Sequence, residues 1–137
     1  MKRTTLVIAA IFVCILNSSC KREVKGRVGG AEVTVVSLKK MAEFKFPGGG
    51  TGYGQPRPFK AEQGKELVVI ELKSDKEVKI AKAQVKDDKG QMYESLFQQI
   101  FEFQDKPREI TVLFEVPEQA VVKTLVINET SFDLSRN

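Results

Sequence analysis

The chain has 137 residues, with 22 lysines and arginines against 18 aspartates and glutamates, and it contains no histidine and no tryptophan. This length suits a single domain. The absence of histidine excludes the Ser-His and Cys-His nucleophile pairs, the usual general base near neutral pH, and His-ligated metal sites. We therefore expect a protein that is not an enzyme and that has neither a metal site nor a cofactor.

The first 19 residues have the order of segments typical of a secretory signal. Positive charge in residues 1–3 precedes an uninterrupted apolar run at 6–16, and two serines stand before Cys20. A charged start, an apolar stretch and small residues before the cleavage point define such a signal. The apolar run of eleven residues would rise about 16 Å as a helix, short of a hydrocarbon core of about 30 Å. We expect a signal peptide at 1–19 rather than a membrane span.

Cys20 follows the expected cleavage point directly, which resembles the arrangement in bacterial lipoprotein precursors. The resemblance implies that the Cys20 thiol carries a lipid, so that the membrane is a partner through this anchor. Lys21 follows the cysteine, which in such precursors favours export to the outer membrane where the cell has one. We expect the domain to belong to the bacterial cell envelope, facing the periplasm or the exterior. Asn17 stands where lipoproteins usually have leucine, so secretion with a free Cys20 is the alternative.

The chain after the signal is nearly neutral and has a single cysteine. Removal of the signal takes away Lys2 and Arg3 and leaves 20 basic residues against 18 acidic ones, a net charge of +2. Such a weak charge predicts no nucleic-acid partner. Cys20 is the one cysteine left, so stability depends on the hydrophobic core without a disulfide. Residues 20–30 are basic, contain glycine and lack periodicity, which predicts a flexible tether before a domain at 31–137.

After the tether the sequence alternates apolar and polar residues as β-strands do. The strongest strand prediction is 66–73 (ELVVIELK), which is rich in β-branched residues; Val68 and Ile70 face one way and Leu67 and Val69 face the other. The predicted strands cover residues 31–36, 38–46, 66–73, 78–86, 91–93, 108–116, 121–128 and 131–134.

Residues 94–104 (ESLFQQIFEFQ) have two interpretations. Their apolar residues recur at helical spacing, whereas phenylalanines are typical of strands. We predict a short helical turn followed by extended chain, with a strand as the alternative. Phe97, Ile100, Phe101 and Phe103 are predicted to lie in the core. An exposed version of this cluster would instead mark a partner site.

About seven strands with turns near every ten residues, and no long amphipathic helix between them, predict an all-β fold, a two-sheet antiparallel β-sandwich. Four stretches carry a family likeness: ELVVIELKSDKEVKI at 66–80, VKDDKGQMYES at 85–95, REITVLFEVPEQA at 108–120 and TLVINETSFDL at 124–134. They resemble the bacterial immunoglobulin-like lipoprotein domain of unknown function, a family sometimes mislabelled as telomeric-repeat-binding-factor-like. The resemblance implies an immunoglobulin-like sandwich outside the cytoplasm, attached to a membrane and without catalytic residues.

Residues 47–58 form a long stretch rich in glycine and proline, which cannot hold a strand ladder. The stretch contains neither of the glycine motifs that bind phosphates. Tyr53, Arg57 and Phe59 lie on or beside it, and aromatic residues and arginine are enriched in protein interfaces. We therefore predict an interaction site at these three residues.

Two pairs of carboxylates have simpler explanations than a functional site. Asp87 and Asp88 lack the spacing of a calcium loop and suit a turn. Glu115 and Glu118 flank a proline and are expected to face solvent.

Together these features predict a membrane-anchored, non-enzymatic envelope lipoprotein that binds another protein or another envelope component. Two alternatives stay open: an enzyme or an enzyme inhibitor of the envelope, and a carrier of a small ligand or metal. Nothing in the residue pattern indicates an oligomeric state.

Overall fold

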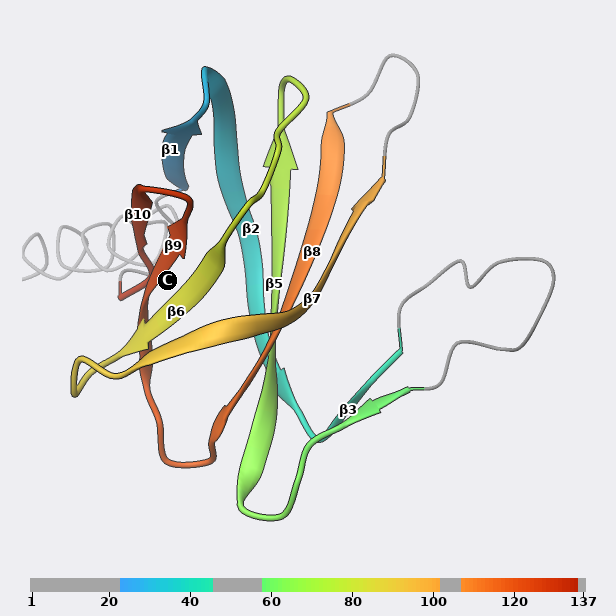
Figure 1. Cartoon of the computed structure of the whole chain (residues 1–137), viewed down its shortest axis with the longest axis vertical. Helices are drawn as coiled ribbons and strands as arrows, with labels where there is room; N and C mark the ends of the chain where they lie inside the picture. Colours follow the sequence, from blue (N-terminus) through green and yellow to red (C-terminus); the bar gives the residue numbers. More distant parts are fainter. Residues whose placement is uncertain (1–22, 46–57, 102–106, 136–137) are drawn as a thin grey trace, which may run out of the picture.

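The computed structural model describes residues 23–45, 58–101 and 107–135, without the side chain of Phe101 (Figure 1). The signal segment, Cys20, Tyr53, Arg57 and Phe103 lie outside these ranges, so the expectations about them stay predictions. The described part is all-β and contains no helix, and hence none that is long and apolar enough to cross a membrane. Its strands are β1 (Val24–Val28), β2 (Ala31–Met41), β3 (Glu43–Phe44), β4 (Phe59–Lys60), β5 (Lys65–Ser74), β6 (Ala83–Asp87), β7 (Met92–Phe101), β8 (Arg108–Pro117), β9 (Val122–Ile127) and β10 (Thr130–Asp133).

A β-sandwich arises because one antiparallel sheet, in the order β1-β2-β5-β8-β7-β6-β9-β10, folds over itself at β7. Residues 92–94 of β7 pair with β6, and residues 95–101 pair with β8. Figure 1 shows β7 running across the molecule between these two neighbours. One layer therefore contains β1, β2, β5, β8 and the end of β7, while the other contains β6, β9, β10 and the start of β7.

The core fills the space between the two layers. Inward-facing residues of β5, Val68 and Ile70, are fully buried there together with Phe114 of β8 and Phe132 of β10. Their neighbours Leu67 and Val69 belong to a second buried cluster on the opposite face of the sheet. The two-sided alternation expected for residues 66–73 is confirmed.

The fold begins earlier than the sequence indicated, because β1 is part of the sheet rather than of a tether. It pairs with β2 through a tight turn at Gly29 and Gly30, both with positive φ (57° and 88°). Glycine adopts this left-handed conformation without the steric cost that a Cβ brings. The expected domain boundary at residue 31 is therefore wrong for Val24–Val28. A Gly-Gly pair between alternating apolar residues is a hairpin signal that the sequence did contain.

The first and last strands meet and close the sandwich. The Thr130 hydroxyl donates a hydrogen bond to the carbonyl oxygen of Arg27 at 2.6 Å. A Cβ placed on Gly26 would lie 2.8 Å from Cε1 of Phe132, closer than real Cβ contacts allow. Glycine at position 26 therefore lets β1 lie directly on the ring of Phe132.

The predicted strand at 78–86 is wrong in its first half, since only Ala83–Asp87 forms a strand. The backbone of residues 79–82, just before β6, forms hydrogen bonds with the side chain of Asn128 instead. Its Oδ1 accepts the N–H groups of Ala81 and Lys82 at 2.9 and 3.2 Å, and its Nδ2 donates to the carbonyl oxygen of Lys79 at 3.0 Å. Polar backbone groups that a side chain satisfies do not need a strand partner.

The helical turn expected within 94–104 is also wrong, because β7 is extended through Phe101. The register of β7 against β8 shifts between Ser95 and Phe97, as at a β-bulge. A bulge adds one residue and moves the following side chains to the other face. That shift turns a two-residue repeat locally into a three- to four-residue repeat, which looks helical in the sequence.

The turn at Asp87 has the form expected for it. Oδ1 of this buried carboxylate accepts the N–H groups of Lys89 and Gln91 at 2.9 and 2.8 Å, and Oδ2 accepts the Tyr93 hydroxyl at 3.1 Å. Burial disfavours the charged form, but the bonds from Gln91, Tyr93 and Lys89 outweigh it and hold the pKa of Asp87 below its ordinary value. Asp87 is thus a structural group that organises its hairpin.

Candidate functional site

The outer face of the sheet, which faces away from the core, carries an apolar cluster. A short arm, made of the paired strands β3 and β4, packs on this cluster. The buried centre of the cluster consists of Leu67 and Val69 from β5 and Leu113 from β8. The β3–β4 hairpin leaves the sheet near one end of β5 (Figure 1). Four partly buried residues pack on this centre: Met41, Phe44, Phe59 and Ala61. We call these seven residues together the outer cluster.

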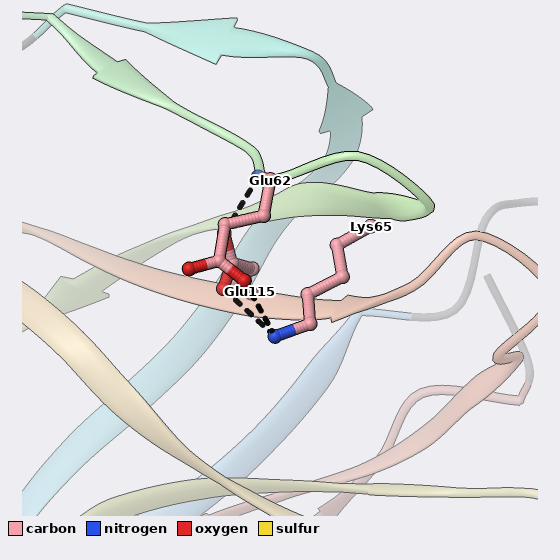
Figure 2. Close-up of polar contacts among 3 residues, drawn as sticks. All are labelled: Glu62, Lys65 and Glu115. Atoms are coloured by element: carbon pink, nitrogen blue, oxygen red, sulfur yellow. Dashed lines mark hydrogen bonds and ion pairs between the residues drawn. The ribbon is translucent and has the colours of Figure 1, made fainter.

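Polar contacts fasten the arm to the sheet (Figure 2). Lys65 Nζ lies 3.1 Å from Glu62 Oε2 and 3.6 Å from Glu115 Oε1, and the Glu62 N–H donates to Glu115 Oε2 at 3.1 Å. The hydrogen bond and charge of Glu62, followed by the charge of Glu115, raise the pKa of Lys65 above its ordinary value. Because the Glu115 side chain is only 17% exposed and is engaged here, the expectation that it faces solvent is wrong.

Beside the arm, β7 presents apolar side chains to solvent. Phe97, which lies opposite Leu113 in the ladder, is 46% exposed, while Leu96 and Ile100 are 50% and 37% exposed. The prediction that Phe97 and Ile100 lie in the core is wrong. The register shift turns Phe97 to the outer face, and β6 pairs with β7 only at residues 92–94, so it does not cover the rest of the strand.

Of the three residues predicted as an interaction site, the structure places Phe59. It is half-buried in the outer cluster, and its ring centroid lies 5.8 Å from that of Phe97. Tyr53 and Arg57 fall outside the described residues. The exposure of Leu96 and Phe97 was not predicted from the sequence, although the uncharged run at 95–101 was a usable signal.

The same outer face has a shallow hollow of about 300 Å³ farther along β5 and β8 from the arm. Glu71, Lys73 and Glu109 are among the residues that line it. The Ser37 hydroxyl donates to Glu71 Oε2 at 2.9 Å, so this carboxylate is already engaged. Nowhere in the described ranges do three or more metal-ligating side chains gather in a group that could hold an ion. The exposed residues Leu96, Phe97 and Ile100, which we call the β7 strip, are therefore the best-defined candidate surface. They offer apolar side chains, and their strand has backbone N–H and C=O groups that no described strand pairs with.

No family model matches the sequence, and no curated protein matches it. Among solved structures, the chain is similar to an uncharacterized beta-sandwich protein from Clostridium difficile 630. The two are 11% identical, the match covers 78% of this chain and 85% of that one, and the TM-score is 0.49. Membership of the immunoglobulin-like lipoprotein family, expected from the residue pattern, therefore stays a proposal.

Proposed function

We propose that this chain is an envelope lipoprotein, anchored through Cys20, whose immunoglobulin-like β-sandwich binds another protein or envelope component without catalysing a reaction. The observation that carries the binding role is the exposed apolar end of β7, with Phe97 on the outer face, Ile100 on the opposite face and Leu96 at the register shift. Neighbouring apolar residues left in solvent at the surface of a small domain are typical of interaction sites.

The anchoring role rests on residues 1–20. The short distance in sequence between Cys20 and the first strand also supports it. Val24, the first residue of β1, follows Cys20 by four residues. Four extended residues span at most about 14 Å. A lipid on Cys20 would therefore hold the sandwich close to the membrane surface, where lateral confinement raises the encounter rate with other membrane-attached proteins.

Cys20→Ser tests the anchor. In cells that make the full chain, the wild-type protein is expected in the membrane fraction with an acyl group on Cys20, detected by mass spectrometry of its first peptide. Cys20→Ser should move to the soluble fraction without this group. Cys14→Ser, inside the apolar run, is the matched control and should behave as wild type. A Cys20→Ser protein that stays on the membrane would refute the anchor.

The binding role has its own test. Phe97→Lys is expected to abolish the cross-linked species that the full-length protein forms in the intact envelope, whereas Val121→Lys, at an exposed position beside the β6–β7 turn and outside residues 95–101, should leave them unchanged. Equal cross-linking by both variants would refute a role for the β7 strip.

A further inference from the structure

The second half of β7 is an open edge of the sandwich. Residues 95–101 pair with β8 on one side, and no strand in the described part of the chain pairs with them on the other. Figure 1 shows β7 moving away from β6 and ending as the outermost strand beside β8. In such a strand, every second residue directs its N–H and C=O away from the sheet, where they can pair with another strand.

This edge lacks the residues that usually keep an edge from pairing. The run SLFQQIF at 95–101 has no charge, proline or glycine, while Glu94 and Glu102 stand immediately outside it. Proteins commonly protect edges with lysine, proline or a bulge. The bulge lies at the start of this run, between Ser95 and Phe97, and the ladder is regular from Phe97 onward. The other two outer strands, β1 and β10, lie against each other.

We propose that this edge pairs, antiparallel, with the same edge of a second copy of the chain. Two identical edges meet in this way around a two-fold axis, and the absence of charge at 95–101 removes the like-charge repulsion that would oppose it. The segment that pairs with this edge must itself be a strand, because the edge presents backbone N–H and C=O groups without a described partner strand. The same uncharged strand is present in every copy.

The register follows from the side-chain pattern. Directly opposite residues in an antiparallel pair lie on the same face, so the axis passes through one residue and not between two. Gln98 is engaged, because its Nε2 donates to the Ile80 carbonyl oxygen at 3.1 Å. Gln99 Oε1 is buried and has no hydrogen-bond partner among the described residues. An axis at Gln99 sets the two Gln99 side chains opposite each other, and each buried Oε1 would gain a donor from the other copy's amide once the side chain turns outward.

Such a pairing would join the five-stranded layers of two copies into one continuous sheet. The outer clusters of both copies then lie on the same face, since opposite residues share a face. This assembly does not depend on the lipid at Cys20. If the lipid is present, confinement to one membrane raises the effective concentration of the two edges.

Disulfide cross-linking tests the register directly. Paired residues in an antiparallel ladder have Cα atoms about 4.5–5.5 Å apart, a distance that a disulfide can bridge. Gln99→Cys in the full chain, oxidised mildly in cells, should give at least about ten times more covalent homodimer than Val121→Cys, a control at a 44% exposed position. The wild-type chain sets the background from its own cysteines. Equal yields from Gln99→Cys and Val121→Cys would overturn the proposal.

A charge on the edge tests the pairing without a cross-link. The full chain in detergent should sediment as a dimer, and Ile100→Lys should raise its dissociation constant more than about tenfold, because two lysines then approach each other. Thermal unfolding checks that the variant is folded, and Val121→Lys is the matched control. A monomeric wild type, or a dimer that Ile100→Lys leaves intact, would overturn the proposal. A Gln99→Cys adduct with a different protein in place of the homodimer would do so as well.

Discussion

The ring of Phe59 lies 5.8 Å from the ring of Phe97, and their planes are tilted by 34°. Phe59 comes from β4 in the arm, and Phe97 comes from β7 beside the open edge. The contact therefore links two segments of the outer surface. Tilted aromatic pairs at this separation attract each other beyond the effect of buried area.

Phe59→Ala and Phe97→Ala should therefore couple. A double-mutant cycle measured by urea unfolding is expected to give an interaction free energy of about 0.5–1.5 kcal/mol. Phe44→Ala combined with Ile100→Ala serves as the control cycle. Additive effects of Phe59→Ala and Phe97→Ala would mean that the two rings do not support each other in solution.

Gly26→Ala should destabilise the domain by about 1–3 kcal/mol, because the added Cβ would collide with the ring of Phe132 and force one of the two strands to shift. Chemical denaturation measures the loss. Lys25→Ala, which shortens an exposed side chain on the same strand, should leave the denaturation midpoint near wild type. If Gly26→Ala unfolds at the wild-type midpoint, β1 does not pack on β10.

Asp87 should make stability depend on pH in the acid range. Its pKa is lowered by folding, so its contribution is complete above the unfolded-state value of about 3.9 and is lost as the pH falls through the lower folded-state value. Asp87→Asn keeps an acceptor oxygen but removes the charge. The variant should be less stable than wild type at pH 6, and this difference should shrink towards pH 2 in urea titrations. Asp88→Asn is the control, and an Asp87→Asn difference that does not vary with pH would contradict the assignment.

Ile70→Ala should cost about 2–5 kcal/mol of unfolding free energy, because Ile70 is fully buried between the two layers. Val36→Ala removes apolar atoms from an exposed position on β2 and should change stability by less than about 0.5 kcal/mol. Equal effects in calorimetry or denaturation would show that the inner and outer faces of the sheet are assigned wrongly.

The strands with regular alternation could be predicted from the sequence, and the places where alternation breaks could not. Residues 66–73 and 108–116 place successive side chains on opposite faces of the sheet without interruption and lie in β5 and β8 within the first layer. At 78–82 the apolar pattern is strand-like, but the Asn128 side chain, which is far away in the sequence, takes up the backbone groups. The local sequence pattern at 78–82 cannot predict a hydrogen-bond partner so far away in the sequence.

The outward position of Phe97 is a second feature that could not be predicted from the sequence. Phenylalanine is normally a core residue, and only the register shift in β7 turns Phe97 outward. Phe59 could be singled out from its place beside the glycine-rich stretch, but its neighbour Phe97 lies 38 residues later in the sequence. Bringing the two together depends on how β5, β8 and the arm pack, which no pattern within either segment specifies.

The bond between Thr130 and Arg27 joins residues that are 103 positions apart. Strand β1 therefore cannot take its final place until nearly the whole chain is available to fold. Contacts of such long range close late, since they require the intervening chain to be ordered first. The end of the fold that is synthesised first is thus among the last parts to become native.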